Sequence, residues 1–195
     1  GARDSAQIGA LFQKDCHWRD ILAFTWDLSA AAGRENIAAG LAAAQESTGA
    51  GGFHLPPDRK PPKEVRRVGR DCIEAAFEFT TTVGRGAGIF RLSDDDGAMK
   101  AWLLSTTLEE LEGFAEKVGD NRPTGAAYSR NFGGDNWEDI RRKASAYDDH
   151  EPTVLVVGGA QAGLSIAARL NQLGVDTLVV EQWPRIGDSW RRRYH

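Results

Sequence analysis

The stretch CIEAAFEFTTTV, residues Cys72 to Val83, alternates between apolar and polar side chains. A period of two residues is that of a β-strand with one buried face. The stretch therefore predicts a long, half-buried strand. Its buried face would carry Ile73, Ala75, Phe77, Phe79, Thr81 and Val83, and its exposed face Glu74, Glu78, Thr80 and Thr82.

Turn sequences after this strand predict an antiparallel meander. Residues 84–86 (GRG) and 96–97 (DG) are of the types that adopt the backbone of hairpin turns. Further strands are expected from Ile89 to Leu92 and from Met99 to Leu108. An antiparallel sheet buries at least one face, so the meander requires covering elements.

Helices predicted before the meander would supply this cover. Helical patterns run from Ser5 to about Asp15 and from Arg34 to Glu46. We therefore expect an α+β domain over residues 1 to 117. The second helix would face the sheet with Ile37, Leu41 and Ala44.

A different pattern, VLVVGGAQAG, begins at Val154. A dinucleotide-binding fingerprint consists of a hydrophobic strand, a glycine turn, a small residue at the pyrophosphate and a small residue where helix and strand pack. Gly158 would make the turn, Ala160 would lie at the pyrophosphate, and Gly163 would let the helix pack on the strand. Ala160 departs from the usual glycine, and its methyl group would push the pyrophosphate outward or shift the helix.

The residues after the glycine turn extend this interpretation. A helix from Gln161 to Leu173 would aim its free N–H groups, those of Gln161 and Ala162 included, at the phosphates. A second strand, Thr177 to Val180, ends at Glu181, whose carboxylate could accept from both ribose hydroxyls and would repel a 2′-phosphate. The alternative is a tight strand-to-helix turn in an unrelated α/β protein; the correct strands, helix and terminal acid favour nucleotide binding.

Two further features make the first region resemble a known fold. An F-x-x-D-x-x-W-R-D string spans Phe12 to Asp20, and TTLEELEG, Thr106 to Gly113, closes the predicted meander. Together they are similar to the NTF2-like, or SnoaL-like, cone fold. The resemblance implies a pocket between sheet and helices, which serves isomerase or cyclase chemistry in some members and only binding or dimerisation in others. A homodimer through this domain is one expectation.

Four residues near the string are candidates for that pocket: His17, Trp18, Trp26 and Asp27. An aspartate beside aromatic rings is a candidate general base. The alternative, which we favour, is that the tryptophans are core, Asp27 caps a helix or is solvated, and His17 is exposed.

The final residues, EQWPRIGDSWRRRYH, follow the predicted ribose-binding acid. They resemble the early FAD segment of flavin-containing monooxygenases and their Baeyer–Villiger relatives, in which a G-[GD]-x-W turn follows that acid. The resemblance implies that Arg185, Gly187 and Trp190 also contact FAD. It implies an FAD-binding Rossmann domain beginning over residues 152–195, after a linker with a charged helix over 118–151.

The expected function follows from both resemblances. The chain is expected to be the N-terminal part of an FAD- and NADPH-dependent monooxygenase of a small organic substrate, inactive by itself, with the NADPH site beyond residue 195. The alternatives are an NTF2-like binding or dimerisation module, and an isomerase or cyclase that uses Asp27 and His17.

Composition limits the remaining function classes. A net charge of −4 without a basic stripe argues against nucleic acid, and no apolar run has the length of a membrane span. The two cysteines, Cys16 and Cys72, form no metal-type pair, which fits a cytoplasmic protein. The histidines are too scattered to predict a metal site.

Overall fold

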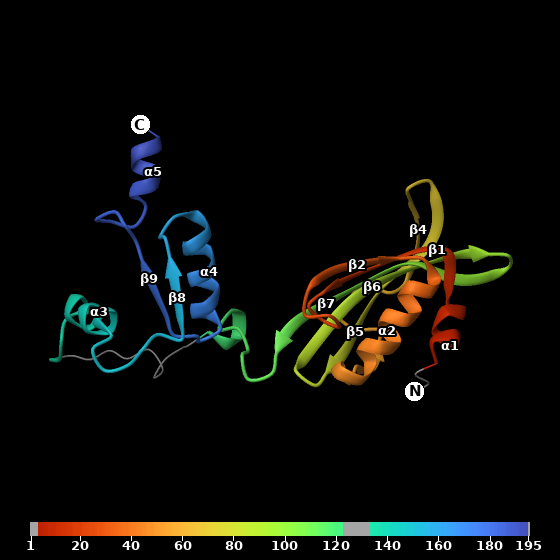
Figure 1. Cartoon of the computed structure of the whole chain (residues 1–195), viewed down its shortest axis with the longest axis horizontal. Coiled ribbons are helices and arrows are strands. Elements are labelled where there is room, and N and C mark those ends of the chain that lie inside the picture. The colour runs from red at the N-terminus through yellow and green to blue at the C-terminus, as the bar shows by residue number, and fades with distance from the viewer. Residues whose placement is uncertain (1–3, 123–132, 195) are drawn as a thin grey trace. The chain divides into compact units, whose positions relative to one another are not determined.

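The structure, a computed structural model, describes residues 4–122 and 133–194. The chain separates into two compact units, Gly1–Gly113 and Phe114–His195 (Figure 1). The boundary expected after residue 117 therefore falls inside the second unit. Part of the expected linker, 123–132, lies outside the described residues.

The first unit is an α+β fold, as predicted. One seven-stranded sheet has the order β2-β1-β7-β6-β5-β3, and β4 pairs with β5. The helices α1 and α2 lie along one face of this sheet (Figure 1). The elements are α1 (Ser5–Ala10), β1 (Phe12–Ile21), β2 (Leu28–Ala32), α2 (Arg34–Thr48), β3 (Gly51–His54), β4 (Lys63–Arg67), β5 (Arg70–Thr81), β6 (Gly84–Asp95) and β7 (Ala98–Leu111).

The predicted helix from Ser5 to about Asp15 is wrong beyond its first turns. Helix α1 ends at Ala10, and Phe12–Ile21 forms strand β1, which runs parallel to β7 and antiparallel to β2. Cys16 and Trp18 are buried while the residues between and beside them are exposed, which is the period of a strand. The strands β2, β3 and β4 were not predicted either.

The predicted meander is confirmed, but β6 begins earlier than expected. The strand starts at Gly84, so residues 84–86 are not the turn; the connection lies at Thr82 and Val83. The predicted turn at Asp96 and Gly97 is confirmed, with φ of 55° and 82°. Positive φ at both central residues is the type I′ geometry that matches the twist of a hairpin.

Glycines on β6 explain how the large rings of β5 lie on the sheet. Phe77 is paired with Gly88 and Phe79 with Gly86. A Cβ on either glycine would stand 2.3 Å from the Cζ of the ring opposite. Each phenyl ring therefore covers a neighbouring glycine, and the two rings form an aromatic surface on one face of the sheet.

The core of the first unit lies between that aromatic surface and α2. The predicted helix there is confirmed as α2, whose Ile37 is fully buried and whose Leu41 and Ala44 pack against the same cluster. Trp18 of β1 and Phe79 of β5 are 3% and 1% exposed. Burial of such side chains supplies the main stabilisation of the unit.

The second unit contains a β-α-β arrangement with parallel strands. The predicted strands β8 (Val154–Val157) and β9 (Thr177–Val180) are confirmed, as is the helix between them, α4 (Gln161–Gln172). The unit also contains a 3₁₀ turn, Gly119–Asn121, and the helices α3 (Trp137–Ala146) and α5 (Asp188–Arg193). In the described residues, no helix is both long enough and apolar enough to cross a membrane.

Candidate functional site

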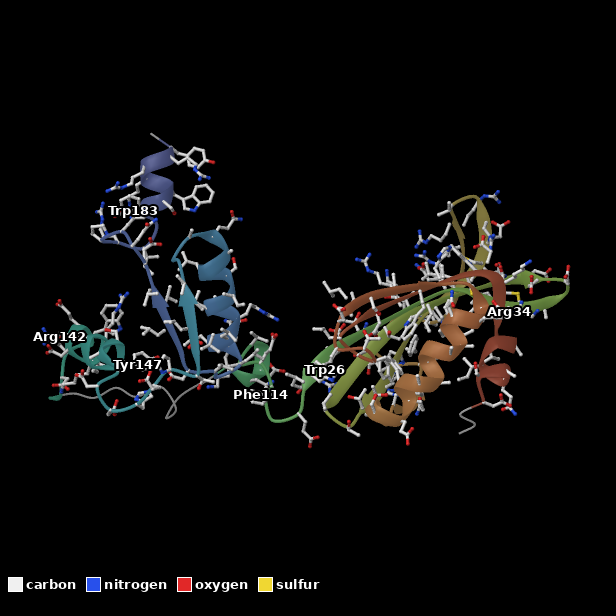
Figure 2. The ribbon with its side chains drawn as sticks, in the orientation of Figure 1. Trp26, Arg34, Phe114, Arg142, Tyr147 and Trp183 are labelled. Atoms are coloured by element: carbon white, nitrogen blue, oxygen red, sulfur yellow. The ribbon has the colours of Figure 1, made fainter. Side chains whose placement is uncertain are left out.

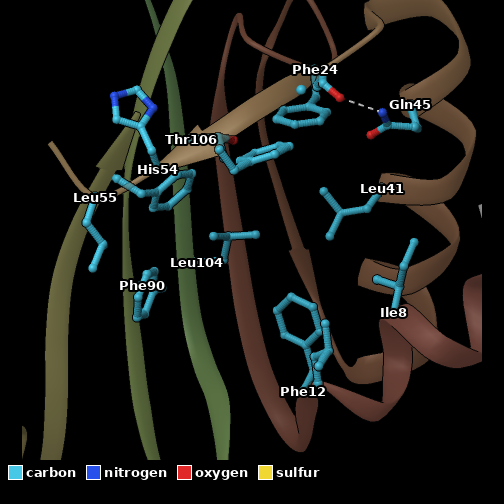
Figure 3. Close-up of a pocket in the computed structure, with 15 residues that line it drawn as sticks. Ile8, Phe12, Phe24, Leu41, Gln45, His54, Leu55, Phe90, Leu104 and Thr106 are labelled. Carbon is cyan, nitrogen blue, oxygen red and sulfur yellow. Dashed lines mark hydrogen bonds between the residues drawn. The ribbon is translucent and has the colours of Figure 1, made fainter. Parts of the chain in front are cut away.

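A cavity of about 810 Å³ lies in the first unit, between the helices and one face of the sheet (Figure 3). That volume falls in the usual range for sites that bind small molecules. Ile8 comes from α1, Leu41 and Gln45 from α2, and Leu104 from β7. The remaining lining residues are Leu11, Phe12, Phe24, Ala50, Gly51, Phe53, His54, Leu55, Phe77, Phe90 and Thr106.

Aromatic rings form a continuous wall of this cavity. Phe53 and Phe77 lie 6.2 Å apart between ring centroids, and Phe77 and Phe90 lie 5.9 Å apart. Phe79, behind the lining, stacks on Phe53 at 5.3 Å and contacts Phe24 at 5.6 Å. These distances are those of favourable aromatic pairs, so the wall is held in place by its own contacts.

Polar groups of the lining are few, and the structure assigns partners to most of them. Gln45 Nε2 donates to the carbonyl oxygen of Ala50 at 2.6 Å. His54 Nδ1 lies 2.9 Å from the carbonyl oxygen of Gly52, so in the neutral ring this nitrogen carries the proton. Among the described residues that line the cavity, none is Asp, Glu, Lys or Arg.

Thr106 connects the cavity to a buried carboxylate. Its hydroxyl donates to Asp20 Oδ1 at 2.5 Å and accepts from Trp18 Nε1 at 2.9 Å. Asp20 is fully buried, and its Oδ2 accepts from the backbone N–H groups of Phe24 and Thr25 and from the Thr25 hydroxyl. These bonds fix the turn between β1 and β2 and hold the Thr106 proton away from the cavity.

A role for Asp20 was not predicted from the sequence. The available signal was its place at the end of the W-R-D string, where a carboxylate follows a buried tryptophan. Alternation along β1 puts Asp20 on the same buried face as Cys16 and Trp18. A carboxylate on that face must be hydrogen-bonded, so the strand pattern predicts such a network once the strand itself is recognised.

The four predicted pocket residues are not brought together. Trp18 is buried in the core, whereas its neighbour His17 is exposed on β1. Trp26 is 57% exposed in the segment between β1 and β2 (Figure 2), and Asp27 Oδ1 accepts from the backbone of Leu28. None of the four is among the described residues that line the large cavity.

The glycine turn of the second unit forms a second candidate site. Gly158 has a φ of +103°, which side chains with a Cβ rarely adopt. A Cβ on Gly163 would stand 1.8 Å from the carbonyl oxygen of Gly158, so only glycine permits this approach of helix α4 to the turn. Ala160 is the N-cap of α4, and Gln161 and Ala162 occupy its first turn, where backbone N–H groups have no partner within the helix.

Glu181 lies beside this turn, directly after β9. Its Oε2 accepts from the backbone N–H of Gly159 at 2.7 Å, and its Oε1 accepts from that of Trp183 at 3.1 Å. Each carboxylate oxygen can accept more than one hydrogen bond, so the held carboxylate still has acceptor capacity.

The other predicted FAD contacts lie in the segment that follows. Arg185 Nε is 3.2 Å from Asp188 Oδ1, and Gly187 has a φ of +84° at the N-cap of α5. Trp190 is 47% exposed and stacks on Tyr194 at 5.2 Å. Within the described residues, no cluster of three or more His, Cys, Asp or Glu side chains could hold a metal ion.

Comparison with known proteins finds likeness in structure only. No family model matches the sequence, and no curated protein matches it. A DUF4783 family protein from Bacteroides uniformis is 7% identical, with 55% of this chain and 88% of that chain covered and a TM-score of 0.42.

Two further solved structures carry descriptions of fold or activity. An NTF2-like protein with a cystatin-like fold from Novosphingobium aromaticivorans is 14% identical over 55% of this chain and 71% of its own, with a TM-score of 0.38. A steroid delta-isomerase from Pseudomonas aeruginosa is 15% identical over 55% and 69%, with a TM-score of 0.36. Sequence identities and TM-scores as low as these say nothing about the activity of this chain.

Proposed function

We propose that the first unit is an NTF2-like module that binds an apolar small molecule in its cavity. The observation that carries the proposal is the cavity itself, about 810 Å³ of space with an aromatic wall and no charged residue in its described lining. A preformed apolar space with few polar groups is the usual form of a small-molecule site.

Binding is better supported than isomerase or cyclase chemistry. Acid–base catalysis needs a titratable group within reach of the ligand. His54 is the one titratable side chain among the described lining residues, and it lies at an exposed position, with 55% of its side chain accessible. The carboxylate of Asp20 is separated from the cavity by Thr106, to which it is hydrogen-bonded.

Naphthalene is a suitable probe because it is apolar, planar and uncharged. We expect it to bind the 195-residue chain and to raise its thermal unfolding temperature. Leu104→Trp should abolish both effects by filling the cavity, since Leu104 lies in its lining (Figure 3). The matched control is Ile89→Trp, because Ile89 lies on the adjacent strand, is 42% exposed and is not among the lining residues. Equal naphthalene binding by both variants would contradict the proposal.

A second function, dinucleotide binding by the second unit, is favoured by the contact between Gly163 and Gly158. The cradle fits a pyrophosphate: the first turn of α4 offers backbone N–H groups, and the φ of Gly158 keeps the turn close to the strand. Gln161 and Ala162 would hold the phosphates, and Glu181 would accept from the ribose hydroxyls. The methyl group of Ala160 would lie nearest the pyrophosphate.

FAD is the dinucleotide that the resemblance of residues 181–195 favours. When bound, it would supply the redox chemistry of an oxidoreductase, and the residues of this chain would bind and orient its ADP half. Monooxygenase activity with NADPH, and contacts from Arg185, Gly187 and Trp190, rest on this second proposal.

Titration with ADP, followed by amide NMR shifts, tests the nucleotide site directly. We expect shifts concentrated at residues 158–163 and at Glu181, and a weaker response to an analogue that carries a 2′-phosphate, because Glu181 would repel it. Glu181→Ala should weaken ADP binding about 10- to 100-fold, the usual loss for a charged hydrogen-bond partner. Shifts scattered over both units, or unaffected by Glu181→Ala, would contradict this site.

A further inference from the structure

The chemistry of the cavity in the first unit narrows the kind of ligand that it can hold. No Asp, Glu, Lys or Arg is among the described lining residues, and Nε2 of the one titratable side chain there, His54, already lies 3.8 Å from Glu78 Oε2. A charged ligand group in the cavity would therefore lose its water without gaining an ionic partner, which is costly. The lining selects for an uncharged molecule.

The aromatic wall favours a planar ligand. Three of its rings, those of Phe53, Phe77 and Phe90, form one chain of contacts with the ring of Phe79 behind them. The angles between neighbouring ring planes in this chain are 19° to 40°. A flat aromatic molecule can add to such a series by offset stacking, which contributes beyond the burial of its surface. The glycines that face Phe77 and Phe79 on β6 keep these two rings flat against the sheet.

Gln45 supplies a hydrogen-bond acceptor inside this apolar space. Its Nε2 is held by the carbonyl oxygen of Ala50, which fixes the amide, and among the described residues no group donates to its Oε1. Figure 3 shows the side chain extending from α2 on the side of the pocket where Phe24 lies, with its hydrogen bond drawn as a dashed line. The other polar groups are less suited, because the Thr106 proton is bound to Asp20 and His54 is held at its Nδ1 by Gly52.

We infer that the cavity accepts an uncharged aromatic molecule with one hydroxyl or N–H group, which donates to Oε1 of Gln45. The inference rests on the proposed binding function of the first unit and specifies its ligand class. A ligand with a donor at that point satisfies the Gln45 amide oxygen, whereas a ligand without one removes this oxygen from water and leaves it unpaired.

Four probes of similar size test the inference on the 195-residue chain at neutral pH: naphthalene, 1-naphthol, 1-methoxynaphthalene and 1-naphthoate. Fluorescence titration should give an affinity for 1-naphthol roughly three- to tenfold above that for naphthalene, the usual gain from one hydrogen bond. 1-Methoxynaphthalene, which has the oxygen but no donor, should show no such gain. 1-Naphthoate should bind at least about tenfold more weakly than naphthalene, because its carboxylate finds no partner.

Gln45→Leu tests whether the preference for 1-naphthol over naphthalene depends on Gln45. The readout is the ratio of the affinities for 1-naphthol and naphthalene within one protein, because Gln45 lines the cavity and its loss also changes the binding of naphthalene itself. This ratio should fall to about one in the variant. Equal affinities for 1-naphthol and 1-methoxynaphthalene in the wild type, a preference that survives in Gln45→Leu, or 1-naphthoate binding as tight as that of naphthalene would each overturn the inference while leaving apolar binding intact. Absence of naphthalene binding would instead overturn the proposed function, and the inference with it.

Discussion

Gly163 lies so close to Gly158 that a Cβ on Gly163 would stand 1.8 Å from the Gly158 carbonyl oxygen. Real Cβ atoms do not approach a backbone oxygen to this distance, so helix α4 can lie this near β8 only with glycine at 163. The same Cβ would be 3.2 Å from Cγ1 of Val156, the buried residue of that strand. Gly163 thus sets the packing of the β-α-β arrangement.

Gly163→Ala should therefore move α4 away from the turn and destabilise the second unit by about 1–3 kcal/mol, the usual cost of forced overpacking. Amide hydrogen exchange in β8 and α4 measures the change, which should be confined to the second unit. Gly159→Ala is the matched control, because its Cβ would meet Glu181 Oε2 at 3.3 Å, a tight but adjustable contact. Equal protection in the two variants would argue against the packing role of Gly163.

Gly88 has the corresponding role in the first unit. A Cβ there would stand 2.3 Å from the Phe77 ring and 2.4 Å from the carbonyl oxygen of Ser105. Gly88→Ala should displace the ring, lower the free energy of unfolding by about 1–3 kcal/mol and weaken naphthalene binding. Denaturant unfolding followed by tryptophan fluorescence gives the stability.

Gly51→Ala is the control for Gly88→Ala. Gly51 also lines the cavity, but its Cβ would meet only the Gly49 carbonyl oxygen, at an ordinary 3.8 Å. We expect a stability change within about 0.5 kcal/mol, as for a substitution without a clash. If Gly51→Ala lowered the free energy of unfolding as much as Gly88→Ala, the packing of the Phe77 ring over Gly88 would not explain the loss of stability in Gly88→Ala.

The sequence pattern predicted β5, whose alternation is regular, and missed β1, in which the alternation is interrupted. On β5, Ala75, Phe77 and Phe79 are buried in strict alternation. At the start of β1, Phe12 and Gln13 are both buried, and the pairing with β7 changes register between Phe12 and His17. That irregularity hides the period of two, and the apolar residues then fit a helical spacing equally well.

The candidate site was predicted less well than the fold, for a physical reason. Phe77 was assigned to the buried face, but a pattern along one strand does not show which rings leave space between sheet and helix. The value of Gln45 as an acceptor depends on its bond to Ala50, a contact made where the chain turns from α2 into β3. Such tertiary placement is invisible in the spacing of apolar residues.

Stability of the first unit should depend on pH through Glu74. Its carboxylate accepts from Arg67 and Arg91, and these bonds, chiefly that from Arg67, lower its pKa from 4.5 to about 2. A carboxylate whose pKa is lowered in the folded state contributes its full stabilisation at pH values above its pKa in the unfolded state. For Glu74 this contribution disappears as the pH falls from about 4.5 toward 2.

Glu74→Gln should consequently cost about 1.5–3 kcal/mol at neutral pH, the range for hydrogen bonds to a charged group. The difference from the wild type should shrink as the pH is lowered from 4.5 toward 2. Unfolding curves for both proteins across this range provide the measurement, with exposed Glu64→Gln on β4 as control. A gap between the curves that stays constant with pH would rule out this role for Glu74.

Two aspartates in the same segment should respond very differently to loss of charge. Asp20 is fully buried and accepts four hydrogen bonds, from Phe24, Thr106 and two groups of Thr25. In Asp20→Asn an NH₂ group takes the place of one acceptor oxygen. This group cannot accept a hydrogen bond, so at least one of the donors around it is left unpaired. We expect a loss of about 2–4 kcal/mol, because several charge-assisted bonds fail together in a buried site.

Asp27→Asn is the natural comparison, since the exposed side chain of Asp27 accepts one hydrogen bond among the described residues, from the backbone N–H of Leu28. The amide oxygen of asparagine can still accept this bond. Its midpoint of denaturant unfolding should change little, and its affinity for naphthalene not at all, because Asp27 is not among the residues that line the cavity. An altered affinity in Asp27→Asn would restore Asp27 as a pocket residue. Similar midpoints for the two variants would mean that the Asp20 network does not hold the turn between β1 and β2.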